Sequence, residues 1–265
     1  MSFQDRISAT ITASVADGIG RIVISNPGRR NAVDLAGWRR LASLVPDLAA
    51  TEGVRVLVIG GASDDFCAGA DISEFGTVRR DAATARVYEQ ANSDAFAALR
   101  HCAVPVIASI RGVCYGGGLG LAAACDLRLA TPDARFAVPA AKLGLAYPAD
   151  AMGDIVRAAG DQLARYLTLT AQPIDAIQAF QAGFLLRVAE PGELDATVEA
   201  IARAIAANAP LSVLASRLAI AATTASDPAM AARAVAIGDR TFDSADYAEG
   251  RAAFGERRAP RFTGR

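Results

Sequence analysis

Three consecutive glycines, Gly116 to Gly118, lie between a strand-like run and a short apolar helix-like run in the segment GVCYGGGLGLAAACD. Glycine allows backbone conformations and close approaches that side chains forbid. The segment therefore predicts a tight loop at which another group comes near the main chain. No acid or base lies among the glycines, so the loop either binds a ligand through backbone groups or is a close-packed turn.

The chain on either side of the glycines predicts a mixed α/β core. Residues 9–15 and 20–25 alternate around Asp17-Gly18, which is typical of a β-hairpin. Asp34 is a suitable N-cap for a helix over residues 35–50. Further strands are predicted at residues 54–60, 104–110, 127–131 and 134–139. Further core helices are predicted at residues 81–99 and 119–124.

From Asp150 onward the chain predicts mainly helices. Ala-rich helical runs occur at about residues 151–159, 161–169, 173–181, 191–207, 211–224 and 244–255. Gly183 is expected to end the third of these. We expect a core domain over residues 1–190 and a helical C-terminal domain over residues 191–265.

Composition limits the possible partners. The chain has 27 basic and 28 acidic residues, with a formal net charge of −1, so it offers no overall attraction for nucleic acid. No apolar stretch reaches the roughly 18 residues of a membrane span, and the N-terminus lacks the pattern of a signal peptide. We expect a cytoplasmic protein with neither a nucleic-acid nor a membrane partner.

Cysteine and histidine spacing predicts no metal site. Cys67, Cys102, Cys114 and Cys125 form no C-x-x-C pair, and we expect them to be small buried hydrophobes. His101 is the single histidine and is expected to be structural or to face solvent.

The glycine loop fits two nucleotide-binding patterns poorly. No Lys-Ser/Thr pair follows it, as a P-loop requires, and Leu121 stands where G-x-G-x-x-G needs its last glycine. A second loop of small residues, FCAGADI, follows the preceding buried strand. Two such loops could direct two backbone N–H groups at a single oxygen, one of them from a helix N-terminus, and so form an oxyanion hole.

Five segments of the chain resemble the enoyl-CoA hydratase/isomerase (crotonase) superfamily, in order and over nearly the whole length. They are ISNPGRRNAVD, FCAGADISEF, PVIASIRGVCYGGGLGLAAACDLRLA, ARFAVPAAKLGL and EGRAAFGERRAPRF. The resemblance implies a spiral of strand-strand-helix turns and a helical C-terminal part that forms trimers or hexamers. It also implies an acyl-CoA thioester as substrate, with coenzyme A as part of that substrate and no separate cofactor.

The resemblance also assigns site residues. It makes the N–H groups of Ala70 and Gly117 the oxyanion hole for the thioester carbonyl. It places coenzyme A binding at Ala68, Asp71 and Ile72 on the adenine side and at Arg29 and Arg30 on the phosphate side. Solvated loop positions remain the alternative for the two arginines.

The chain departs from the hydratase pattern at both acid positions. The two glutamates that position water and move a proton in hydratases correspond to Gly120 and Ala140. Asp150, two residues beyond a position that carries an acid in other members, is our candidate general acid/base, with the Tyr147 hydroxyl nearby. An ordinary helix N-cap is the alternative for Asp150.

Other charged residues near the loops are weaker candidates. Glu74 and Glu89 could reach the acyl end of the site, and Lys142 is expected to face outward. Hydration by another route, isomerisation, decarboxylation and hydrolysis all stay open as reactions. A CoA-thioester binding protein without catalysis and a nucleotide-binding oxidoreductase are the alternatives from other classes.

Overall fold

The computed structural model describes residues 9–265, so residues 1–8 of the predicted core domain lie outside the description. Strands β1 (Thr10–Ala16) and β2 (Ile19–Ser25) pair antiparallel. Asp17 and Gly18 between them have φ of 52° and 76°, the left-handed values that a tight hairpin turn requires. The predicted hairpin is confirmed.

The main sheet has six strands in the order β1-β2-β3-β4-β6-β9. Its further strands are β3 (Val56–Gly61), β4 (Val106–Ile110), β6 (Leu127–Ala130) and β9 (Arg187–Val188). From β2 onward every neighbouring pair is parallel. Every residue of β4 is buried, as expected of a strand covered on both faces.

A smaller sheet of three strands carries the segment that leads into the glycines. Its strands are β5 (Val113–Tyr115), β7 (Arg135–Ala137) and β8 (Ile174–Asp175), in that order. Strand β5 corresponds to the strand-like run that precedes the glycines in the sequence. It pairs in parallel with β7, and this pairing fixes the direction in which the chain enters the glycine loop.

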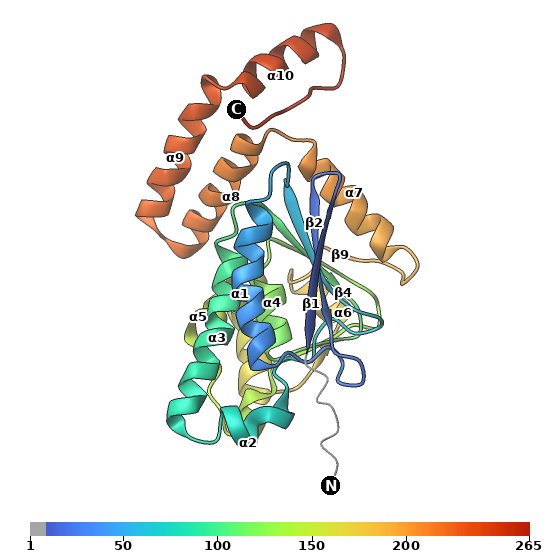
Figure 1. The fold of residues 1–265 in the computed structure, drawn as a ribbon, viewed down its shortest axis with the longest axis vertical. Helices are drawn as coiled ribbons and strands as arrows, with labels where there is room; N and C mark the ends of the chain where they lie inside the picture. Colours follow the sequence, from blue (N-terminus) through green and yellow to red (C-terminus); the bar gives the residue numbers. More distant parts are fainter. Residues whose placement is uncertain (1–8) are drawn as a thin grey trace.

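Helices cover both faces of the main sheet (Figure 1). Helices α1 (Leu35–Ala49), α3 (Ala82–Arg100) and α4 (Gly117–Ala124) pack on the face that includes Leu57 and Ile59. Helix α7 (Leu194–Ala206) packs on the opposite face, against Val56 and Ile107. Alternate residues of one strand thus serve two apolar layers. The other helices that accompany the core are α2 (Phe75–Val78), α5 (Ala149–Arg165) and α6 (Ala176–Gln181).

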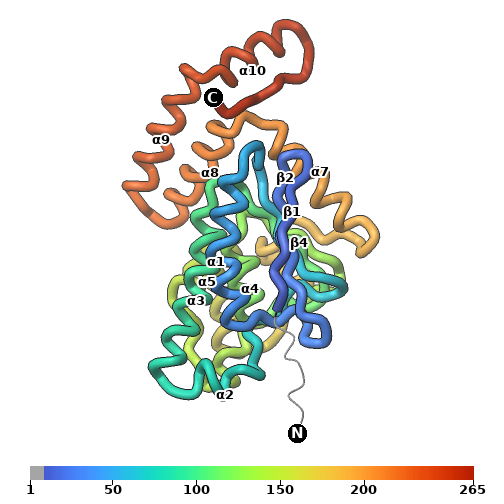
Figure 2. Tube along the Cα trace, viewed as in Figure 1, coloured from blue at the N-terminus to red at the C-terminus, as the bar shows by residue number. Residues whose placement is uncertain are grey.

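The last three helices extend away from the sheet (Figure 2). They are α8 (Pro210–Ala225), α9 (Pro228–Phe242) and α10 (Ala245–Glu256). Helices α8 and α9 lie side by side and share a small apolar cluster that includes Leu218 and Ile237. The predicted division near residue 190 stays a prediction, and α7, just beyond it, belongs by packing to the sheet.

Two helix predictions need correction. Helix α9 was missed, although Asp227 caps its N-terminus and Pro228 occupies its first turn. Helix α5 begins at Ala149 with Pro148 as its N-cap, so the N-cap alternative for Asp150 is wrong, because Asp150 lies in the first turn. The predicted break near residue 160 is present, since Gly160 has non-helical angles of 78° and 165°.

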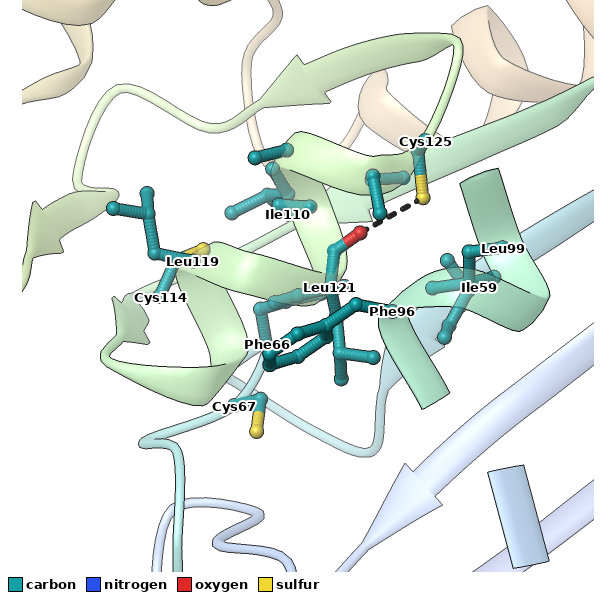
Figure 3. Packing of buried hydrophobic residues seen from close by; sticks show 14 of the residues in the cluster. Ile59, Phe66, Cys67, Phe96, Leu99, Ile110, Cys114, Leu119, Leu121 and Cys125 are labelled. Atoms are coloured by element: carbon teal, nitrogen blue, oxygen red, sulfur yellow. Dashed lines mark hydrogen bonds between the residues drawn. The ribbon is translucent and has the colours of Figure 1, made fainter. Parts of the chain in front are cut away.

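The four cysteines are free and buried, as predicted. Cys67, Cys114 and Cys125 lie among apolar side chains between the sheet and α4 (Figure 3). Within residues 9–265, no cluster of three or more His, Cys, Asp or Glu side chains could hold a metal ion. In the same residues no single helix is long and apolar enough to cross a membrane; α7 and α8 pass that test only when joined across a 108° bend.

Candidate active site

The two loops predicted to act together are joined by their main chains. The N–H of Cys67 donates to the carbonyl of Val113 at 2.9 Å, and the N–H of Tyr115 donates back to the carbonyl of Cys67 at 3.0 Å. A Cβ atom on Gly118 would lie 2.2 Å from the carbonyl oxygen of Cys67. The two loops therefore form one rigid unit that only a glycine at position 118 allows.

Ala70 and Gly117, the predicted oxyanion-hole residues, line the same cavity. The loops approach so closely that a Cβ on Gly69 would lie 3.0 Å from the Gly117 nitrogen. Gly117 is the first residue of α4, where the helix dipole favours negative charge. Among the described residues, the N–H groups of Ala70 and Gly117 donate to no protein acceptor. Two residues with unpaired N–H groups thus line one small space.

The cavity is small and mainly apolar, at about 110 Å³. Five segments line it: the loop at 68–72, the region of α2, helix α3, the glycine loop, and residues 139–148. The polar side chains that reach it are Arg79, Glu89, Asn92 and Tyr147. Asp150 is absent from the lining.

Gly120 stands at one of the two positions where hydratases carry a glutamate, and the structure leaves no room there for a side chain. A Cβ atom there would lie 2.7 Å from Phe96 Cζ and 2.8 Å from the Tyr147 hydroxyl oxygen. Phe96 is buried and packs edge-on against Trp38, with ring centroids 5.8 Å apart. The Tyr147 hydroxyl donates to the Gly116 carbonyl at 2.9 Å. Two aromatic side chains therefore fill the place of the acid.

Ala140, the other predicted glutamate position, is half-buried and lines the cavity. It lies in a 3₁₀ turn, Pro139–Leu143, that closes one side of the cavity. Here a larger side chain would meet the cavity rather than a packed ring.

The structure does not bring Asp150 to the donors. Its carboxylate accepts from the Ser93 hydroxyl at 3.1 Å and lies 3.6 Å from the Arg100 guanidinium. Its side chain is 36% exposed. The position thus supports a role in joining α3 to α5, and the predicted acid/base role has no geometric support.

Glu74 serves the main chain rather than the cavity. Its carboxylate accepts from the N–H of Leu35 at 2.7 Å, at the start of α1. Burial raises the pKa of Glu74, the Leu35 N–H opposes that rise, and the nearby Asp34 and Asp71 add to it. Lys142 and His101 are exposed, as expected.

Glu89 reaches the cavity from α3 and pairs with Arg79. Burial raises the pKa of Glu89, and the Arg79 cation opposes that rise. Arg79 is only 9% exposed and lies over the rings of Phe75, at 4.5 Å from the centroid, and Tyr88, at 5.1 Å. An acid and a buried cation are thus held together at the wall of the cavity.

Sequence reasoning missed Arg79 and Asn92 as site residues. Asn92 follows Glu89 by three positions and precedes Phe96 by four, so the three side chains share one face of α3. That spacing was a readable signal for Asn92. Nothing in the sequence indicated Arg79, because it follows a short helix whose placement depends on the fold.

The residues predicted to bind coenzyme A come together on one edge of the site. Arg29 donates to the Asp71 carboxylate at 2.7 Å, and the N–H of Ala68 donates to the carbonyl of Arg30 at 2.9 Å. Ile72 is 68% exposed and lies at the mouth of the cavity.

Val33 joins these two segments through the backbone. Its N–H donates to Gly69 at 2.8 Å, and its carbonyl accepts from the N–H of Asp71 at 2.9 Å and from the Tyr88 hydroxyl at 3.1 Å. Burial disfavours the charge on Asp71, but hydrogen bonds from Ser73 and the cation of Arg29 outweigh burial and lower its pKa. Asp71 is therefore an ionised anchor of this edge.

Comparison with known proteins gives one consistent family. The family model described as Enoyl-CoA hydratase/isomerase matches residues 14–265. A short-chain-enoyl-CoA hydratase of Clostridium acetobutylicum is 31% identical over 240 residues, which are 89% of this chain and 91% of that protein.

Solved structures agree with this match. An enoyl-CoA hydratase/carnithine racemase from Magnetospirillum magneticum superposes with a TM-score of 0.91 at 36% identity, covering 96% of each chain. An enoyl-CoA hydratase from Bacillus anthracis gives 0.86 at 26% identity, covering 96% of this chain and 99% of that one. The predicted fold class is therefore confirmed.

Proposed function

The chain belongs to the enoyl-CoA hydratase/isomerase family, and from this premise we propose that it acts on an acyl-CoA thioester through an enolate. The observation that carries the proposal is that Ala70 and Gly117, whose N–H groups are unpaired, line one mainly apolar cavity. A thioester carbonyl oxygen held between them gains negative charge as a neighbouring C–H bond ionises. Fixed donors stabilise that charge, and loss of one such donor costs on the order of 3 kcal/mol.

The proposed position of coenzyme A follows from the same geometry. The segments at 29–30 and 68–72 are joined by hydrogen bonds and lead to the cavity. The exposed side chain of Ile72 offers an apolar contact at the mouth, and the cations of Arg29 and Arg30 suit phosphate groups. Coenzyme A would enter as part of the substrate.

Hydration through two glutamates is not the reaction we propose. Gly120 has its space filled by Phe96 and Tyr147, and Ala140 carries no acid. Isomerisation, decarboxylation and thioester or C–C hydrolysis all pass through a stabilised oxyanion and stay within the proposal. The second candidate function, thioester binding without turnover, is favoured by the same two positions, because neither can transfer a proton.

The experiment compares butyryl-CoA with its thioether analogue, S-butyl-CoA, which lacks the carbonyl oxygen. Calorimetry is expected to show at least about tenfold tighter binding of the thioester, which corresponds to about 1.4 kcal/mol. Difference infrared spectroscopy with a ¹³C-labelled carbonyl is expected to show a lowered stretching frequency in the bound state. Equal affinities and an unshifted carbonyl band would overturn the proposal. Titration with NADH tests the oxidoreductase alternative and is expected to show no binding.

We further propose that α8, α9 and α10 assemble the chain into trimers or hexamers. Large apolar side chains on these helices are solvent-exposed in the single chain, including Ile220, Val235, Phe242 and Phe254. Exposed apolar area of this kind is typical of a protein interface. Light scattering is expected to give three or six times the 27.3 kDa chain mass, and a monomer would contradict the assembly.

A further inference from the structure

Helix α3 forms one wall of the cavity and carries polar side chains on the face that lines it. Glu89, Asn92 and Phe96 repeat at helical spacing and all line the cavity. The Asn92 side-chain oxygen lies 3.7 Å from the place where a Cβ of Gly117 would stand. Helix α3 therefore borders the same cavity as Ala70 and Gly117 and comes close to the glycine loop at Asn92.

Glu89 is the one carboxylate among the described residues that line this cavity. The other nearby acids serve different partners. Glu74 accepts from the N–H of Leu35, Asp71 accepts from Arg29, and Asp150 accepts from Ser93 outside the cavity. Among these acids, only Glu89 lines the cavity as a proton acceptor for a bound acyl group.

Arg79 restricts the Glu89 carboxylate to one position. Its guanidinium pairs with Glu89 and stacks on the rings of Phe75 and Tyr88, and its side chain is nearly buried. A planar cation in contact with two neighbouring aromatic rings has little freedom to move away from its partner. The pair is a built part of the site and not a mobile surface contact.

We propose, on the basis of the function proposed above, that Glu89 is the catalytic residue that moves the substrate's proton and that Arg79 is its positioning residue. The Glu89 carboxylate takes a proton from the α-carbon of the acyl group. The C–H electrons form the carbon–carbon double bond of the enolate, and the carbonyl π electrons move to the oxygen between Ala70 and Gly117. The protonated Glu89 exchanges its proton with solvent and returns a proton to carbon, so the step needs no oxidant or reductant.

The charges around Glu89 set the pH range of this step. Arg79, from the end of α2, stabilises its ionised form, whereas burial and the carboxylate of Asp150 on α5 oppose ionisation. Asp150 is itself paired with Arg100, and the neutral hydroxyl of Tyr147 also faces the cavity. Since the ionised form is the base, the rate is expected to rise as pH increases through the pKa of Glu89.

The test is exchange of the α-protons of butyryl-CoA in D₂O, followed by mass spectrometry. Glu89→Gln keeps the shape of the side chain and is expected to slow exchange by about 100-fold or more, with unchanged butyryl-CoA affinity. Asp94→Asn is the matched control, because Asp94 is an exposed carboxylate on the same helix that contacts Gln90. Its exchange rate is expected to equal that of the wild type.

Two further variants separate catalysis from structure. Glu89→Asp shortens the acid and is expected to keep a measurable part of the rate. Arg79→Gln removes the stabilising cation and is expected to move the acidic limb of the pH–rate profile to higher pH. A lowered rate with an unmoved limb would show that Arg79 acts only on structure.

The outcomes distinguish this inference from the function on which it rests. If the thioester binds with a polarised carbonyl but Glu89→Gln exchanges at the wild-type rate, the role of Glu89 is wrong and the proposed function stands. If the wild-type protein binds the thioester and exchanges no proton, the role of Glu89 is also wrong. That result would favour the second candidate function, thioester binding without turnover. If the thioester is not preferred over the thioether, the proposed function itself fails.

Discussion

The cavity has two walls that differ in what they present: a loop wall, formed by residues 68–72 and the glycine loop, and a helix wall, formed by α3 and the end of α2. The loop wall presents main-chain N–H groups from Ala70 and Gly117. The helix wall presents side chains, chiefly Glu89 and Arg79, from α3 and the end of α2. In the proposed function, the backbone of the loop wall polarises the thioester carbonyl, and the side chains of the helix wall determine what happens to the polarised group.

This difference explains why the binding mode and the reaction are separable in this chain. The placement of the donor residues depends on backbone pairing between Cys67 and Cys114. An acid depends on a single side chain and on room for it. Both predicted glutamate positions lack an acid, and yet the donors remain in place. The two proposals together describe a chain that keeps thioester recognition while its proton-transfer group lies at another position.

The largest effect on the free energy of unfolding is expected when an acid is introduced at position 120. In Gly120→Glu the new side chain would collide with Phe96 and the Tyr147 hydroxyl and bury a carboxylate without a partner. We expect a loss of more than about 3 kcal/mol in the free energy of unfolding. Urea denaturation followed by circular dichroism measures it.

Ala140→Glu is the matched variant, because Ala140 borders the open cavity. We expect a change in the free energy of unfolding within about 1 kcal/mol. Equal losses in Ala140→Glu and Gly120→Glu would show that position 120 is not specially filled, and that the two predicted acid positions are equivalent in space.

A smaller but still large effect is expected from a single methyl group in the loop wall. In Gly118→Ala the Cβ would lie 2.2 Å from the carbonyl oxygen of Cys67, a backbone atom that cannot rotate away. We expect a loss of about 3 kcal/mol in stability and weaker thioester binding, because the two loops must separate. Thermal denaturation and butyryl-CoA calorimetry measure the two effects.

Gly76→Ala is the control for this change. Gly76 lies in α2, and a Cβ atom there would have no neighbour within 4 Å. We expect a gain of about 0.5 kcal/mol from the higher helix propensity of alanine. A comparable loss in both variants would mean that the glycines serve flexibility and not close approach.

Local signals made much of the fold predictable. Asp34 and the Asp17-Gly18 turn act on their immediate neighbours, and both are found as predicted. The meeting of the two small-residue loops was also predictable, because small residues must occur where two backbones meet. The oxyanion-hole role of Ala70 and Gly117 came from the family resemblance and stays a prediction. Helix α9 carried equally local signals in Asp227 and Pro228, so this helix was predictable from the sequence although it was missed.

The helix wall was less predictable, for a physical reason. Whether Glu89 or Asp150 reaches the cavity depends on how α3 and α5 cross, and that crossing follows from packing far along the chain. Asp150 was chosen for its place in the sequence, yet the fold turns it toward Ser93 and Arg100. Arg79 became visible only once α2 was placed against Tyr88.

The smallest effect is expected at the edge where the loop wall meets the predicted coenzyme A segment. Asp71→Asn removes the charge that pairs with Arg29, whose own side chain is 45% exposed. We expect a loss of about 1 kcal/mol at neutral pH, since exposure weakens the pair. Because the pKa of Asp71 is lowered in the folded state, its contribution is present above the ordinary aspartate pKa of about 3.9 and is lost as pH falls through the folded value.

The difference in the free energy of unfolding between wild type and Asp71→Asn is therefore expected to shrink below about pH 4. Asp133→Asn, at an exposed aspartate, is the control and is expected to match the wild type at every pH. A difference for Asp71→Asn that stays constant with pH would mean that Asp71 acts through shape and hydrogen bonding alone. The charge of Asp71 would then contribute nothing to the stability of the loop wall. In this respect the loop wall would differ fully from the helix wall, which carries the acid Glu89.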